Sequence, residues 1–137
     1  MNARQSGFTM IELIVVIIIL GVLSAVALPK FVDMRSNAEQ ASADGIAGAA
    51  AAAMNLNFSG CALMNNVPTA NKCVGVSTCA GVGNILQGGL DTRYTAAVNV
   101  AGADIGTTNG ATATCKVSKT VGSTTYASTF TGVSAGN

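Results

Sequence analysis

Glu12 is the residue that most needs a chemical explanation, because it is the one charged side chain in the apolar stretch Phe8–Leu28. A carboxylate inside a membrane-spanning helix costs roughly 2.5 to 3.5 kcal/mol even on lenient insertion scales, so such an acid is expected to have a function and a partner. The stretch itself holds no Lys or Arg. The sequence therefore predicts that a positive group from elsewhere neutralises Glu12.

The pair Gly7 and Phe8 forms a candidate cleavage junction that would supply this group. Cutting there would remove a leader of residues 1–7 and leave a free amino group on Phe8, four residues before Glu12. When copies of the chain pack side by side, the ammonium on Phe8 of a neighbouring copy could neutralise the acid. This hypothesis accounts for the leader, the acid and the apolar stretch together.

Two other interpretations of the N-terminus remain open. The stretch could be a secretory signal peptide cut after Ala27, although it is longer than a usual signal core of about 7 to 15 residues. It could also be a plain membrane anchor oriented with Arg4 inside the cell. Neither interpretation explains Glu12.

The four cysteines, which all follow the apolar stretch, are expected to form disulfides in an oxidising compartment. Three pairings are open. We favour Cys61–Cys73, which would close a loop, and Cys79–Cys115, which would tie a short helix to a strand. Metal binding is the weaker interpretation, because Cys73 and Cys79 lack C-x-x-C spacing and the chain has no His.

The composition argues against two large classes of function. Only 9% of the residues are charged and the formal net charge is +1, so the clustered Lys and Arg that bind phosphates are missing and no nucleic-acid partner is predicted. The chain has no His, and its Asp residues are scattered without forming a recognisable pair. We therefore expect neither an enzyme nor a cofactor.

A family resemblance follows from the residues Gly7-Phe8-Thr9-Met10-Ile11-Glu12-Leu13. They resemble the G-F-T-x-x-E-L junction of the type IV prepilins, the family of pilins and pseudopilins. The resemblance covers roughly residues 4–53, and Leu28-Pro29-Lys30-Phe31 is similar to the continuation in pilins of the mannose-sensitive haemagglutinin kind. It implies that a prepilin peptidase cuts after Gly7 and N-methylates Phe8, and that Glu12 acts in assembly.

The same resemblance implies a fold, a location and a set of partners. The fold would be α+β, with a long N-terminal helical spine packed by its second half on a small antiparallel sheet. The precursor would sit in the inner membrane, and the mature chain would join identical subunits in an extracellular helical filament with the help of inner-membrane assembly machinery. A pseudopilin of a secretion system or a minor pilin is the alternative within the family. A membrane-anchored binding domain that never polymerises is the alternative outside it.

The spine is predicted as two segments, an apolar one over 8–28 and an amphipathic one over 29–54. Gly21 and Pro29 mark its weak part, where a kink is expected and where assembled pili of the family are often unwound. Residues 46–53 are apolar all round and are expected to be covered on most sides, and residues 55–60 are expected to end the helix. One apolar face is predicted, made of Phe31, Met34, Ala38, Ala41, Gly45, Ala49, Ala52 and Leu56.

The remainder is predicted as a loop region over 55–92, with a short helix near residues 79–86, followed by an antiparallel sheet and C-terminal region over 93–137. The alternation of apolar and polar residues indicates strands over 93–100, 111–118 and 124–131. Asn109-Gly110 is a hairpin turn signal, and a second turn is expected near Gly122.

Overall fold

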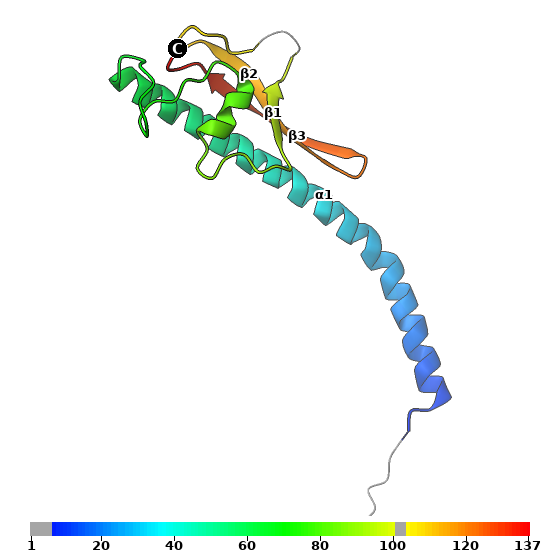
Figure 1. Ribbon diagram of the computed structural model, residues 1–137. Coiled ribbons are helices and arrows are strands. Elements are labelled where there is room, and N and C mark those ends of the chain that lie inside the picture. Colours follow the sequence, from blue (N-terminus) through cyan, green and yellow to red (C-terminus); the bar gives the residue numbers. More distant parts are fainter. Residues whose placement is uncertain (1–6, 101–103) are drawn as a thin grey trace, which may run out of the picture. The chain divides into compact units, whose positions relative to one another are not determined.

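The computed structural model describes residues 7–100 and 104–137, so residues 1–6 of the predicted leader lie outside the described part. Five elements follow one another: helix α1 (Met10–Leu63), 3-10 helix η1 (Cys79–Asn84), and strands β1 (Thr95–Val98), β2 (Thr112–Val121) and β3 (Thr124–Val133) (Figure 1). The chain divides into two compact units, Met1–Ala38 and Glu39–Asn137, and each is described by itself. The predicted α+β class is confirmed, because the second unit packs α1 on a three-stranded antiparallel sheet.

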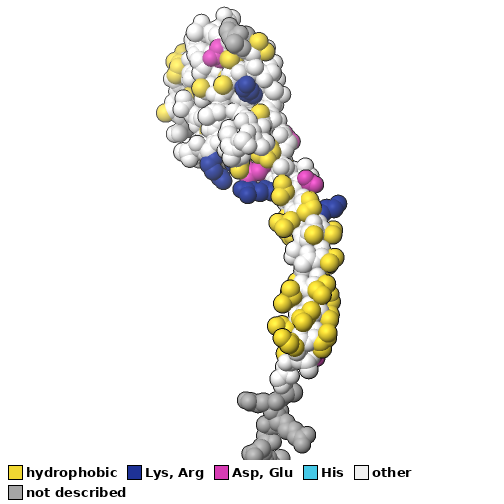
Figure 2. Space-filling model, turned by 90° about the vertical axis from the view of Figure 1, so that its right-hand side faces the viewer, with side chains coloured by type: hydrophobic (Ala, Val, Ile, Leu, Met, Phe, Trp, Pro, Cys, Tyr) yellow, Lys and Arg dark blue, Asp and Glu magenta, His cyan; other side chains and the backbone are white. Residues whose placement is uncertain are grey.

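The first unit consists of the N-terminal part of α1. The helix continues without interruption through Gly21 and Pro29, so the predicted kink and unwinding there remain predictions. The large apolar side chains from Phe8 to Met34 are 45% to 83% exposed, and Figure 2 shows them along the rod. By length and composition, α1 is the one helix of the described residues that could cross a membrane.

The sheet of the second unit has the order β1-β2-β3, with both pairs antiparallel. In its register Cys115 of β2 lies between Val98 of β1 and Phe130 of β3. The inner face of the sheet buries Cys115, Val117 and Phe130 against Ala47, Ala50 and Met54 of α1, together with residues of η1. Burying these apolar surfaces is the main force that holds α1 on the sheet.

The face of α1 that is buried differs from the predicted one. The buried residues are Ala43, Ala47, Ala50, Met54, Asn57 and Cys61, whereas all eight residues of the predicted apolar face are exposed. Because Ala and Gly surround this part of the helix on all sides, the apolar period hardly distinguishes one face from another. The face of the helix that carries Met54 and the disulfide-bonded Cys61 is the buried one. Ala49 and Ala52 lie on another face and are exposed.

The helix also ends later than predicted, at Leu63 rather than near residue 55. The side-chain amide of Asn57 does not compete with the helix, because it donates to Val74 O at 2.8 Å and accepts from Val74 N at 2.9 Å. A glycine is needed at position 60, because the carbonyl of Lys72 lies where a Cβ would be. The loop that follows the helix thus hydrogen-bonds to the side chain of Asn57 and packs against Gly60 in the last turns. The sequence alone does not reveal these contacts.

The predicted strands are present with shifted ends, but Asn109-Gly110 lies in the longer connection 99–111 between β1 and β2 and does not form a two-residue hairpin turn. The tight connection is between β2 and β3, where Gly122 has a φ of 62°, a conformation that favours glycine. Asn109 instead fastens the end of the chain: its Nδ2 donates to Asn137 O at 2.7 Å, and Asn137 N donates to its Oδ1 at 3.0 Å. A turn is present at these residues, as predicted, but the Asn109 side chain binds Asn137 at the end of the chain.

Two disulfides link the second unit, Cys61–Cys73 and Cys79–Cys115, which are the pairs that the sequence analysis favours. Asp104 assists the second one, because its Oδ1 accepts from Cys79 N at 2.8 Å at the start of η1. Asp91 is also a turn residue, since its Oδ1 accepts from Arg93 N at 2.9 Å. The Arg93 guanidinium, 2.7 Å away, holds the pKa of Asp91 well below its usual range.

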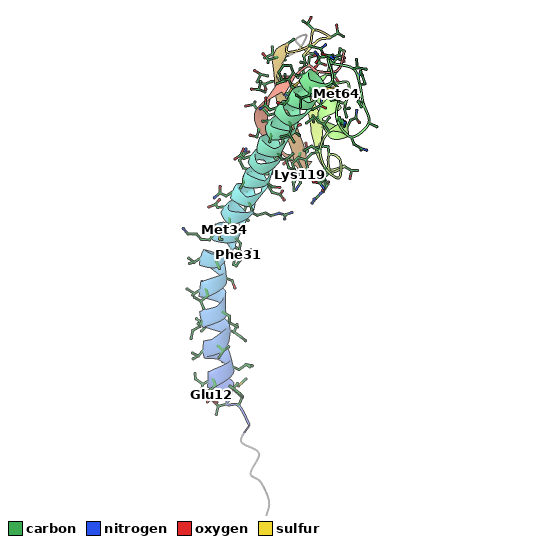
Figure 3. All side chains as sticks on the ribbon, turned by 90° about the vertical axis from the view of Figure 1, so that its left-hand side faces the viewer. Glu12, Phe31, Met34, Met64 and Lys119 are labelled. Carbon is green, nitrogen blue, oxygen red and sulfur yellow. A yellow bond between two sulfur atoms is a disulfide. The ribbon has the colours of Figure 1, made fainter. Side chains whose placement is uncertain are left out.

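A polar cluster ties the sheet to the part of α1 where the second unit begins. Lys119 Nζ of β2 lies 2.5 Å from Glu39 Oε2, and both side chains are largely buried. Lys119 is labelled in Figure 3. Tyr94 accompanies them, with its hydroxyl 2.7 Å from Ser42 Oγ and its ring 5.5 Å below the Lys119 ammonium. Since little water screens this pair, it contributes more than an exposed ion pair would.

Candidate functional site

The candidate site lies at the start of α1, where Thr9 and Glu12 form a reciprocal helix cap. The helix begins at Met10, so Thr9 is the N-cap and Glu12 is its third residue. Glu12 Oε2 accepts from Thr9 N at 2.8 Å and from Thr9 Oγ1 at 2.6 Å. Glu12 N lies 3.4 Å from Thr9 Oγ1. This is the capping box, which satisfies N–H groups that the first turn leaves without partners.

Sequence reasoning identified Glu12 but missed Thr9. The signal was available, because Thr9-Met10-Ile11-Glu12 has the T-x-x-E spacing of a capping box and precedes an apolar run. Glu12 therefore has a local structural role in addition to the assembly role that its position in an apolar stretch predicts. The negative charge at this end also interacts favourably with the helix dipole.

The cap does not use the whole carboxylate. Both of its hydrogen bonds end on Oε2, which leaves Oε1 for a further donor. Glu12 is exposed and, within the described residues, takes part in neither of the two ion pairs. A cation that approaches from outside the chain can therefore bind it without breaking the cap.

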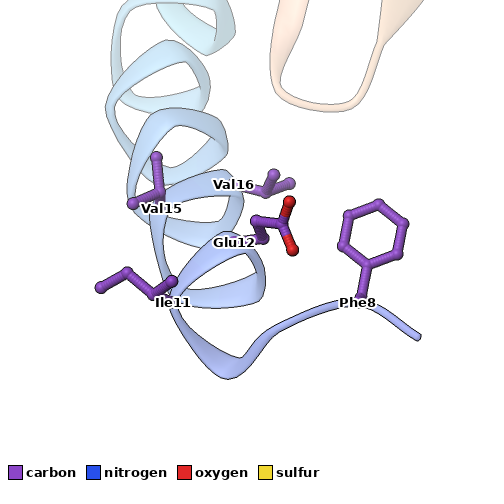
Figure 4. A pocket seen from close by; sticks show the side chains of 5 residues that line it. All are labelled: Phe8, Ile11, Glu12, Val15 and Val16. Atoms are coloured by element: carbon purple, nitrogen blue, oxygen red, sulfur yellow. The ribbon is translucent and has the colours of Figure 1, made fainter. Parts of the chain in front are cut away.

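An apolar hollow surrounds this carboxylate. It has a volume of about 290 Å³ and is lined by Phe8, Ile11, Glu12, Val15 and Val16. Figure 4 shows the Phe8 ring on one side of the carboxylate and Val16 on the other. Glu12 is exposed in the single chain, so a charge pair formed here would be shielded from water, and thereby strengthened, only where a neighbouring molecule covers the hollow. The hollow is therefore suited to receive a small cationic group from a neighbouring molecule.

Replacing Thr9 by Val should weaken the cap without removing the charge of Glu12. Loss of an N-cap hydroxyl costs about 0.5 to 2 kcal/mol of helix stability. We expect amide hydrogen exchange at residues 10–13 to become roughly 2- to 30-fold faster in detergent micelles, measured by mass spectrometry. Thr9→Ser keeps the hydroxyl and should exchange like the wild type. Equal exchange in Thr9→Val and the wild type would show that the cap does not hold the first turn.

The other predicted site residues lie elsewhere. Gly7 precedes the helix, with open space where a Cβ would be, and Gly21 and Pro29 lie inside α1. The cysteines belong to the core of the second unit. Within residues 7–100 and 104–137, no group of three or more His, Cys, Asp or Glu residues is placed to hold a metal.

Comparison with known proteins places this N-terminal region. Residues 2–28 match the model of the prokaryotic N-terminal methylation motif. The chain is 52% identical over 46 residues to the type IV narrow pilus major component PilA5 of Thermus thermophilus. The matched stretch covers 34% of this chain and 40% of that protein. It is 43% identical over 42 residues to the type IV major pilin protein PilA of Myxococcus xanthus, covering 31% and 19% of the two chains.

A third relative is the type IV major pilin protein PilE1 of Neisseria gonorrhoeae, 54% identical over 39 residues that cover 28% of this chain and 24% of that one. The matched part thus spans 40% or less of the length of each of these relatives. No solved structure matches the chain. The three relatives are named as a major pilus component or as major pilins, and the N-terminal residues that carry the resemblance carry the match as well. By this N-terminal segment the chain is similar to the type IV pilins.

Proposed function

We propose that this chain is a prepilin, which a prepilin peptidase cuts after Gly7 and N-methylates on Phe8. The mature chain then polymerises through α1 into an extracellular type IV pilus that serves adhesion, surface interaction or motility. In this proposal residues 1–7 are the leader, the precursor is held in the inner membrane by residues 8–28, and inner-membrane machinery assembles the fibre. The role is structural rather than enzymatic.

The observation that carries the proposal is the state of Glu12. Its Oε1 has an unused acceptor position, its surroundings are apolar, and the described part of the chain supplies it with no cation. The new amino group on Phe8 of another copy is a small cation that fits this position. An acid buried with such a partner is tolerated, whereas an acid buried alone is strongly unfavourable.

The exposed surface of α1 supports polymerisation independently. Large apolar side chains line the helix from Phe8 to Met34, and water covers such a surface only at a high free-energy cost. In the bilayer lipid covers it, and outside the bilayer other copies can. If one face of each copy contacts a different face of the next copy, the copies form a ring when their rotation closes a full circle. When the rotation does not close, the copies form a helical filament.

Mass spectrometry of the mature N-terminus tests the proposal. We expect a chain that begins at Phe8 with an added N-methyl group, purified from surface fibres. A chain that begins at Leu28 would indicate a secretory signal peptide and would refute the proposal. Fibres whose subunits still carry residues 1–7 would refute the role given to the Phe8 amino group.

A further inference from the structure

One turn of α1, residues 39–42, is fastened to the sheet by side chains at three of its four positions. The first contact is the ion pair between Glu39 and Lys119 of β2, whose side chains are 20% and 11% exposed. The second contact reaches the edge strand β3, where Gln40 Nε2 donates to Ala127 O at 3.0 Å. These two contacts tie the turn to both long strands.

The third contact links the turn to the start of the remaining strand, β1. Ser42 Oγ lies 2.7 Å from the hydroxyl of Tyr94, the residue directly before β1. Tyr94 is 5% exposed, and the centre of its ring lies 5.5 Å from the Lys119 ammonium. Because Tyr94 meets both side chains, the contacts of Ser42 and of Lys119 support each other. The turn 39–42 is therefore held by residues in, or directly beside, all three strands.

The turn stands where α1 first gains cover. Within the described helix none of the residues 29–38 is buried, and the first buried residue is Ala43. The boundary between the two compact units also falls directly before Glu39. Most of the stability of a helix in a protein comes from packing rather than from its own backbone bonds. Residues 29–38 are therefore held less firmly than the residues that follow the turn.

Unwinding of α1 would approach this turn from the N-terminal side. Gly21 and Pro29 weaken the helix, since glycine has a low helix propensity and proline has no N–H. An unwound segment grows residue by residue, because each further step breaks only one backbone bond. At residues 39–42 the next steps also break contacts to the sheet, and all three contacts lie within about one turn of 3.6 residues. Unwinding therefore becomes much more costly there.

We propose that the turn 39–42 acts as a stop for the unwinding of α1, so that the weak part can unwind while the core of the second unit stays folded. This rests on the proposed filament function, since the unwinding is the one expected for the assembled state. The stop itself is a property of the single chain, because every contact that forms it lies within one molecule. It can accordingly be tested without fibres.

Amide hydrogen exchange of the full chain in detergent micelles tests the stop, read by mass spectrometry with fragmentation that resolves the residues of α1. In an α-helix the amides of 43–46 donate to the carbonyls of 39–42, so they exchange when this turn opens. We expect a step in protection, with the amides of 33–38 exchanging about 100-fold faster than those of 43–46. An even change in exchange along the helix, with no step at the turn, would overturn the proposal.

Lys119→Met removes the ammonium and keeps a long side chain. We expect exchange at 43–46 to become about 10-fold faster or more, while exchange at 33–38 stays unchanged. Lys116→Met is the matched control, because successive side chains of a strand alternate between faces and Lys116 lies on the face away from α1. This control should leave the step as it is in the wild type. Faster exchange at 33–38 in Lys119→Met would show that the ion pair supports the whole helix and is not a stop.

A second variant keeps the test decisive if Lys119→Met does not fold. Gln40→Ala with Ser42→Ala removes the other two contacts, and we expect it to reduce the step as Lys119→Met does. Alanine has the highest helix propensity, so weaker intrinsic helix formation cannot cause the faster exchange. A step of wild-type size in this variant would overturn the proposal, because burial from Ala43 onward would then be sufficient to end the unwinding.

A disulfide variant separates the stop from the general stability of the second unit. The Cys61–Cys73 bond belongs to the smaller cluster at the end of α1, outside the segment that opens. With Cys61→Ala and Cys73→Ala, exchange at 43–46 should therefore stay close to the wild-type rate. If it becomes as fast as in Lys119→Met, these amides exchange through unfolding of the whole unit, and the turn is not a separate stop. Failure of the wild type to form fibres would count against the filament proposal and would leave the exchange result unaffected.

Discussion

Glu12→Gln is expected to abolish fibre assembly while leaving membrane insertion and the helix cap intact. Glutamine retains an oxygen that can accept from Thr9 N and Thr9 Oγ1, so the capping box is preserved. The negative charge that we propose to pair with the Phe8 amino group of the next copy is lost, which would leave that ammonium without a partner in an apolar surrounding. Removing one member of such a pair costs about 3 to 5 kcal/mol, which corresponds to roughly 100-fold or greater weakening of the contact.

The measurement is the amount of subunit in sheared fibres relative to the amount in membranes. Glu12→Ala removes both the charge and the side-chain half of the cap, so the two variants together separate the two roles of this residue. If Glu12→Gln assembles normally and Glu12→Ala does not, the acid acts only as a cap. Asp33→Asn, which removes an exposed charge from the same helix, should assemble normally and serves as the matched control. If the protein is instead a membrane-anchored monomer, the wild type and all three variants should insert equally well and form no fibres.

Removal of the Cys79–Cys115 disulfide is expected to have the largest effect on the stability of the second unit. The bond closes a span of 36 residues, for which the loss of chain entropy in the unfolded state is worth roughly 4 kcal/mol. Both sulfurs are fully buried in the main core, and Gly132 packs directly against that of Cys115. A domain of this size has about 5 to 15 kcal/mol in total, so the loss is a large fraction of it.

Urea titration of the detergent-solubilised full chain, followed by tyrosine fluorescence, measures this effect. We expect Cys79→Ala with Cys115→Ala to lower the free energy of unfolding by roughly 3 to 5 kcal/mol. Cys61→Ala with Cys73→Ala is the matched comparison, because that bond closes only 12 residues and belongs to a smaller cluster. A larger loss from the 61–73 pair would contradict the assignment of the main core to Cys79 and Cys115.

Residues with strong local contrast allowed much of the fold to be predicted. In much of β2 and β3 a polar Thr, Lys or Ser alternates with an apolar residue, so the period of two is evident and the strands lie within a few residues of their predicted places. The apolar part of α1 is equally evident from its composition. The pairing of the cysteines was one of three open choices, and the structure contains the favoured one.

Where the side chains are alike, the sequence did not distinguish the alternatives. The Ala-rich part of α1 has no polar face to indicate its orientation, so the predicted and the buried faces differ. The end of α1 depends on Val74 and Lys72, which meet Asn57 and Gly60 only after folding. The capping role of Thr9, by contrast, could have been predicted from the T-x-x-E spacing alone.

The uninterrupted course of α1 through Pro29 has a consequence for how such a fibre responds to tension. Pro29 has no N–H, so one rung of the helical hydrogen-bond ladder is missing there, and Gly21 lowers the resistance of the turns before it. A stretched helix should yield first between these two residues. Each residue that changes from helical to extended lengthens the chain from about 1.5 Å to about 3.3 Å, so this short span would act as an elastic element with a reach of roughly 15 Å per subunit.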